Sequence, residues 1–240
     1  MKTKWLPFIP LLLAAPVSQA LATEFKVEIT NLTNANYFTP LIVSSHSRSV
    51  DMFELAEPAT AALQAIAEGG DVSAMQTALE QSGADVAIAD TPTGAPVLAP
   101  GETASATVDS NRLNRRLSLA AMILPTNDAF VGLDSINLRY VFSKTYFLYG
   151  YDAGTEANNE LLNVPGGGAP GVLGIPGDPS GLSGSGGTGV ATADTNTTVH
   201  IHRGIIGDSD LFGGASDLDS SAHRWQNPVA KVVITRLHNY

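Results

Sequence analysis

The sequence predicts an all-β protein, an antiparallel β-sandwich, and three observations carry this prediction. Residues 25–31 alternate apolar and polar side chains, which is the period of a strand with one buried face. Further strand-like runs occur at residues 39–45, 103–109, 117–124, 136–142, 199–206 and 229–237. Turn-rich segments separate these runs, as they do in antiparallel sandwiches.

Two segments depart from the strand pattern. Residues 52–82 are rich in Ala, Leu, Gln and Glu, and residues 59–68 and 72–81 predict two short helices. Asp71 or Ser73 can cap the second helix, and Gly83 can end it. Residues 165–189 are dominated by Gly, Pro and Ser and predict a long flexible loop. Because the strand pattern resumes afterwards, we expect this loop to be an insertion within one domain.

The first 22 residues have the pattern of a secretory signal peptide. A Met-Lys-Thr-Lys start is followed by a short apolar run and by Ala20-Leu21-Ala22. We expect a secreted protein, periplasmic or extracellular, whose domain covers residues 23–240. No later run of about 18 apolar residues occurs, so no membrane-spanning segment is predicted. The chain has no cysteine, and its stability is expected to come from a hydrophobic core.

The composition narrows the function classes. The chain has 13 Lys and Arg against 23 Asp and Glu, a formal net charge of −10. Nucleic acid and anionic membrane surfaces are poor partners for such a charge. The sequence has no Cys nucleophile, no Gly-x-Ser-x-Gly elbow and no glycine-rich phosphate loop leading into a helix. We therefore expect a binding protein and not an enzyme.

Four motifs occur in order along the chain: Tyr37-Phe38-Thr39-Pro40, Phe53-Glu54-Leu55-Ala56, Pro125-Thr126-Asn127-Asp128-Ala129-Phe130-Val131-Gly132 and Tyr151-Asp152-Ala153-Gly154-Thr155-Glu156. With these motifs, residues 25–237 resemble the spondin N-terminal (F-spondin type) domain in a bacterial-type secreted version. The resemblance implies a C2-like β-sandwich with a calcium ion held by loops at one end. Asn127 and Ala129 depart from the family's usual Pro and Trp, and Glu156 replaces an Asp.

Three carboxylates are the candidate calcium ligands. The resemblance implies this role for Asp128, Asp152 and Glu156, and calcium takes six to eight oxygen ligands. From the residues alone, Asp128 can equally make an Asx turn, and Asp152 a turn beside Gly154. Whether Glu54 or Asp134 joins the site stays open. An ion bound there is expected to order the loops and present a surface to a partner.

His200 and His202 give an alternative metal site. Separated by one residue on a predicted strand, both side chains lie on the same face. This spacing can bind zinc or copper, and it supports the alternative of a transition-metal-binding protein or metalloenzyme. A second acidic cluster is either a solvated turn or a weak cation site; it consists of Asp208, Asp210, Asp217 and Asp219.

The sequence thus leaves three hypotheses for the function. The first is a secreted calcium-binding adhesion module with an unknown protein or glycan partner at the cell surface. The second is the histidine-based metal site, and the third is a structural envelope component without a metal. The family's animal members carry cysteines and thrombospondin-type repeats. This chain has neither, so their adhesion partners are not carried over.

Overall fold

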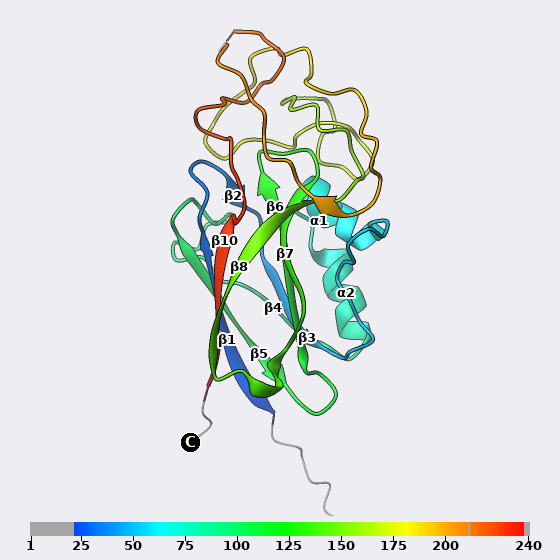
Figure 1. Ribbon diagram of the computed structural model, residues 1–240, viewed down its shortest axis with the longest axis vertical. Helices are drawn as coiled ribbons and strands as arrows, with labels where there is room; N and C mark the ends of the chain where they lie inside the picture. The colour runs from blue at the N-terminus through cyan, green and yellow to red at the C-terminus, as the bar shows by residue number, and fades with distance from the viewer. Residues whose placement is uncertain (1–21, 211, 238–240) are drawn as a thin grey trace, which may run out of the picture.

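The structure is a computed structural model, and it describes residues 22–210 and 212–237. Its strands are β1 (Thr23–Asn31), β2 (Tyr37–Phe38), β3 (Ile42–His46), β4 (Asp85–Ile88), β5 (Thr103–Ser110), β6 (Arg116–Leu124), β7 (Ala129–Asn137), β8 (Ser143–Asp152), β9 (His200–Ile201) and β10 (Ala230–Arg236). Two helices, α1 (Ala61–Gly69) and α2 (Ser73–Gln81), and a 3-10 turn, η1 (Leu138–Tyr140), complete the elements (Figure 1). The predicted all-β class with a short helical excursion is confirmed. The predicted signal peptide lies, apart from Ala22, outside the described residues.

The strands form one antiparallel sheet that nearly closes on itself. Its order is β4-β3-β6-β7-β8-β10-β1-β5, with β2 paired to β6 and β9 paired to β8. The two edges meet at a bridge in which Asp90 and Ser105 exchange backbone hydrogen bonds of 2.8 and 3.0 Å. Opposite walls of the sheet therefore face each other across one core, as the two layers of a sandwich do.

Strand β6 lies at the centre of this arrangement and is buried on both faces. Leu117, Leu119 and Ile123 join the main core, where they meet side chains of β1 and β10 such as Val27 and Val232. The alternate residue Ala120 packs in a second core under the helices. Burial on both faces explains why the sequence of β6 is a nearly continuous apolar run and does not alternate between apolar and polar residues.

The helices cover the outer face of β3, β6 and β7. Thr60 caps α1 by accepting a hydrogen bond of 3.1 Å from the Leu63 backbone, and Gly70 ends the helix with φ +69°. Leu63 and Ile66 of α1 pack with Phe130 of β7 and with Met75 and Leu79 of α2; all five are buried. The helical segment thus forms part of the core.

Two strand predictions were wrong in position. Residues 136–142 hold the end of β7, the turn η1 and the connection to β8, while β7 and β8 occupy residues on either side. In the run predicted at 199–206, only His200–Ile201 is a strand, because the chain then leaves the sheet. Residues 165–189 contain no helix or strand, as expected. That residues 23–240 form one domain stays a prediction.

The molecule has two contrasting ends. The loops between β8 and β10 gather beyond the sheet at one end, at the top of Figure 1. The connections β5–β6 and β7–β8 lie at the other end, where the strand β1 begins. We call these the loop end and the strand end. Among the described residues, no helix is long and apolar enough to cross a membrane.

Candidate functional site

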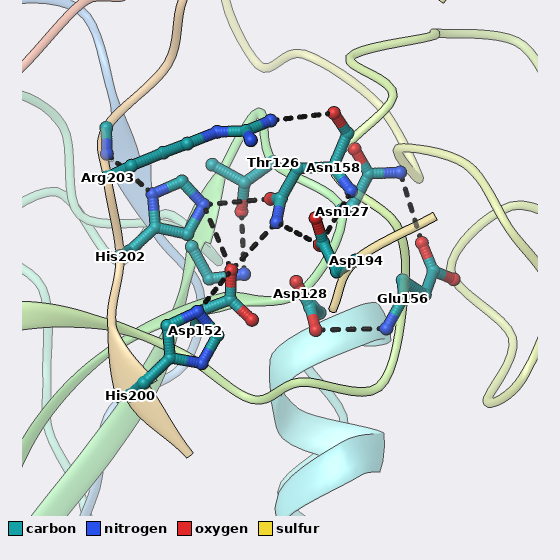
Figure 2. A network of polar contacts seen from close by, with 12 residues as sticks. Thr126, Asn127, Asp128, Asp152, Glu156, Asn158, Asp194, His200, His202 and Arg203 are labelled. Carbon is teal, nitrogen blue, oxygen red and sulfur yellow. Dashed lines mark hydrogen bonds and ion pairs between the residues drawn. The ribbon is translucent and has the colours of Figure 1, made fainter. Parts of the chain in front are cut away.

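Strand pairing brings the candidate carboxylates together at the loop end. β7 begins at Ala129, directly after Asp128, and in the antiparallel register Ala129 lies opposite Asp152, the last residue of β8. Thr126 shapes the preceding turn, since its hydroxyl accepts a hydrogen bond of 3.1 Å from the Ala129 backbone. Figure 2 shows Asp128, Asp152 and Glu156 grouped above the end of a helix.

Asp128 is fully buried, and only one of its two carboxylate oxygens accepts hydrogen bonds from the described residues. Its Oδ2 accepts hydrogen bonds from the backbone of Thr155 (2.8 Å) and Glu156 (3.1 Å) and from the Thr155 hydroxyl (3.2 Å). Its Oδ1 accepts none from any described residue. Burial raises the pKa of Asp128 to about 7, and the neighbouring charge of Asp152 adds to the rise. The site therefore disfavours this negative charge unless a cation accompanies it.

Glu156 repeats this pattern. Its Oε2 accepts hydrogen bonds from Asn127 (3.1 Å) and from the backbone of Gly174 (3.2 Å), while its Oε1 accepts none from the described residues. Burial raises the pKa of Glu156 to about 7, and the charges of Glu68 and Asp128 raise it further. The contact with Gly174 ties the glycine-rich loop to the candidate site.

Asp152 is satisfied on both oxygens. Oδ1 accepts a hydrogen bond of 2.8 Å from the Gly154 backbone, and Oδ2 one of 2.7 Å from Asn158. Burial raises its pKa, although these hydrogen bonds and His200 oppose the rise. Gly154 has φ +69°, and a Cβ there would lie 2.6 Å from the backbone carbon of Thr197. Only glycine fits this turn.

The two histidines both approach Asp152, as their shared strand face predicts. His200 Nε2 lies 3.7 Å and His202 Nε2 lies 4.0 Å from Asp152 Oδ2. His202 is buried, and burial lowers its pKa to about 3, so it is neutral. Its Nδ1 accepts from the Gly204 backbone (2.9 Å), and its Nε2 therefore donates to Asn158 Oδ1 (2.9 Å). Neither nitrogen of His202 is left to bind a metal.

His200 is arranged differently. Its Nδ1 lies 2.8 Å from the Thr198 carbonyl, which can only accept, so Nδ1 carries the proton. Its Nε2 is then the atom that faces Asp152. A carbonyl behind the ring in this way commonly orients a metal-binding histidine. The two histidines thus differ: both nitrogens of His202 make hydrogen bonds, whereas His200 Nε2 faces only the Asp152 carboxylate.

Asparagines and a further aspartate complete the network, and sequence reasoning missed them. Asn158 donates to Asp152 and, at 2.8 Å, to Asp194 (Figure 2). Asn127, which departs from the family pattern, donates to Glu156 and, at 2.9 Å, to Asn159. Asn158 and Asn159 could have been found from the sequence, because they follow the candidate ligand Glu156 by two and three residues. Nothing in the sequence around Asp194 marks it.

Comparison with known proteins identifies the family of this chain. The Spondin_N family model matches residues 24–161, more than half of the chain. The chain belongs to the Spondin_N family. It is also 28% identical to human Spondin-2 over 125 residues, which are 50% of this chain and 38% of Spondin-2. The aligned part thus spans well under half of that relative.

The Spondin_N match contains Asp128, Asp152 and Glu156 but ends before His200 and His202. The family model therefore covers the three candidate carboxylates but not the two histidines. Among residues 22–210 and 212–237, no group of three His, Cys, Asp or Glu side chains is arranged to hold a metal ion. Asp134 is engaged elsewhere, accepting hydrogen bonds of 2.9 Å from the Met52 backbone and the Ser118 hydroxyl.

The second acidic cluster of this Spondin_N chain organises loops. Asp208 Oδ2 accepts from the backbones of Ala215 and Ser216, each at 2.9 Å. Asp217 Oδ2 accepts from the Leu162 backbone at 2.7 Å, and its Oδ1 from the backbone of Gly187 at 2.8 Å. These contacts fit the turn interpretation, with Asp217 buried instead of solvated.

Proposed function

We propose that this chain is an exported, calcium-binding spondin-type module that binds a partner through its loop end. The observation that carries the proposal is the pair of buried carboxylate oxygens, Asp128 Oδ1 and Glu156 Oε1, that accept no hydrogen bond from the described residues. A buried acceptor without a partner is costly, and a cation would satisfy both oxygens.

The surroundings support a hard cation. The nearby charges acting on these two groups come from Asp152 and Glu68, which are also acidic. Calcium accepts carboxylate, amide, carbonyl and water oxygens together, so a site need not contain three carboxylates. Asp128 and Glu156 would hold the ion, and Asp152 is the third candidate. Bound calcium would neutralise the loop carboxylates.

Ion binding would connect three separate segments. Asp128 belongs to the β6–β7 turn, Glu156 follows β8, and Glu156 also contacts the glycine-rich loop through Gly174. A cation shared by the two carboxylates would hold these segments in one arrangement. The activity we propose is therefore binding and not turnover, with a protein or glycan partner at the cell surface.

The test is thermal melting of the purified protein in chelator and across a calcium titration. We expect a saturable rise, equivalent to about 2.7 kcal/mol at 100 times Kd. Asp128→Asn and Glu156→Gln should each abolish most of it. Asp210→Asn, an exposed acid in the second cluster, is the matched control and should keep it. No rise in the parent up to about 10 mM calcium, beyond the range of weak extracellular sites, contradicts the proposal.

The histidine alternative has one specific observation in its favour: His200 Nε2 lies 3.7 Å from Asp152 Oδ2, while the ring is held from behind through Nδ1. It predicts that zinc or copper raises the melting temperature and that His200→Ala removes the effect. His202→Ala should not remove it selectively, because both of its nitrogens are already engaged. If neither calcium nor a transition metal shifts the melting temperature, the result favours the hypothesis of a structural envelope component without a metal.

A further inference from the structure

Six of the eight arginines line two cavities at the strand end. Arg112, Arg115 and Arg139 line both cavities. Arg236 completes one, and Arg48 and Arg116 complete the other. The β5–β6 and β7–β8 connections supply the three shared arginines. A protein that is acidic as a whole therefore has a concentrated basic surface.

These arginines have no acidic partners. Among the described residues, none of the six makes an ion pair. Arg116 donates only to the Ser135 carbonyl (3.0 Å), and the Arg139 guanidinium lies over the Tyr140 ring, 5.2 Å from its centre. Like charges held close together repel one another. An arriving anion would relieve this repulsion.

Large apolar side chains stand exposed among the arginines. Leu113 is 80% exposed and lines the same cavity as five of them. Tyr140, which contacts Arg139, is 75% exposed, and Phe142, two residues further, is 71% exposed. Two separate connections thus present apolar tips beside guanidinium groups. Exposed apolar side chains and arginines without ion pairs together fit a ligand that is both anionic and apolar.

We propose that the strand end docks on an anionic lipid surface. Arginine binds phosphate oxygens through paired N–H groups, so the arginines would contact lipid headgroups. Leu113, Tyr140 and Phe142 would enter the boundary between headgroups and acyl chains. A soluble polyanion would satisfy the arginines but leave these three side chains in water. The apolar tips therefore favour a membrane as the occupant.

The net charge of −10 is unevenly distributed: nine of the 23 acidic residues lie in residues 152–219 of the loop end, although Glu24 and Asp109, paired across β1 and β5, do lie at the strand end. Strand β6 runs from Arg116 at the strand end to Leu124 at the loop end, and its 9 residues span about 30 Å. The Debye length at physiological salt is only about 8 Å. Docked in this way, the protein would direct its loop end away from the membrane. This inference does not depend on calcium binding.

Co-sedimentation with lipid vesicles tests the proposal. The full exported protein is mixed with phosphatidylcholine vesicles, with or without about 30% phosphatidylglycerol, at rising salt. We expect binding to the anionic vesicles alone, weakening as salt increases. Arg112→Gln/Arg115→Gln should weaken it roughly 25-fold, at about fivefold per arginine. Arg224→Gln, an exposed arginine elsewhere, is the matched charge control and should bind like the parent.

A second pair of variants separates a membrane from a soluble polyanion. Leu113→Ser/Phe142→Ser should weaken vesicle binding about tenfold while leaving binding to dextran sulfate unchanged. Leu182→Ser, an exposed leucine at the loop end, is its control and should have no effect. Equal binding to neutral and anionic vesicles, or full vesicle binding by the apolar double variant, overturns the proposal. Binding to dextran sulfate without vesicle binding would instead assign a soluble polyanion.

Discussion

The two ends of the molecule use charge in opposite ways. Residues 152–219 of the loop end carry nine acidic side chains and only one basic one, Arg203. The central carboxylates there, Asp128 and Asp152, are buried and held by backbone and amide hydrogen bonds. At the strand end, Arg48, Arg112, Arg115 and Arg139 are exposed and make no ion pair.

This difference separates two kinds of site. A buried charged group must be positioned by its surroundings, and its cost appears in stability. An exposed charged group costs little to keep and remains available to a ligand from solution. The loop end should therefore respond strongly in stability measurements, and the strand end should respond in binding measurements.

The pH dependence of stability should distinguish the two ends most strongly. The pKa of Asp128 and of Glu156 is about 7 in the folded protein, against 3.8 and 4.5 as ordinary values. Between about pH 4 and pH 7 the folded state therefore holds protons that the unfolded state has lost, and stability falls as pH rises. In chelator we expect these two groups together to contribute a loss on the order of 6 kcal/mol.

The measurement is denaturant unfolding of the parent and of Asp128→Asn/Glu156→Gln across this pH range. His202 acts in the opposite direction, since its lowered pKa makes stability rise with pH, so the difference between the two profiles is the quantity to compare. Parallel profiles would show that the two carboxylates do not carry raised pKa values. Saturating calcium should remove the parent's loss if the ion binds there.

A backbone change at the loop end should come next in size. Gly154→Ala places a Cβ against the Thr197 backbone and should cost about 3 kcal/mol. Gly94 has the same φ of +69° but nothing within 4 Å of an added Cβ. Gly94→Ala therefore reports the conformational cost alone, about 1 kcal/mol. Equal losses in the two variants would mean that the Gly154 turn relaxes without disturbing the carboxylates.

Asn158 offers a smaller and more local change. Asn158→Ala removes the hydrogen bonds to Asp152, Asp194 and His202, and should cost about 2 kcal/mol. Asn34, an exposed loop asparagine whose side chain donates one hydrogen bond of 3.1 Å to the Ala222 carbonyl, is the control residue, and Asn34→Ala should cost only about 0.5 kcal/mol. Chemical denaturation at pH 7 measures both. A similar cost for both would show that the network around Asp152 is dispensable.

The fold was predictable where local pattern and tertiary burial agree. Alternation at residues 25–31 gave β1, and the composition of residues 59–81 gave both helices. β7 and β8 were misplaced because β7 begins directly after the Asp128 turn, without a break that a sequence pattern shows. The register that places Asp152 opposite Ala129 depends on the pairing of β7 with β8, so it could not be predicted either.

The candidate site was predictable only in part, for the same physical reason. Asp128, Asp152 and Glu156 lie within one motif series, whereas Asp194 reaches the network from a distant loop through Asn158. The arginine cluster combines residues from Arg48 to Arg236, so the net charge conceals it. Sequence composition adds charges without placing them, and only the sheet topology collects these arginines at one end.

The strand end should show the smallest effect on stability. Arg115→Gln removes an exposed charge from a like-charged group, so we expect the free energy of unfolding to change by less than about 0.5 kcal/mol, with a slight gain at low salt. Asp128→Asn supplies the comparison at the loop end, where the change should be larger and depend on pH. Urea unfolding at low and high salt measures both variants. A loss well above that limit in Arg115→Gln would mean that the arginines hold the fold together, and the contrast between the two ends would fail.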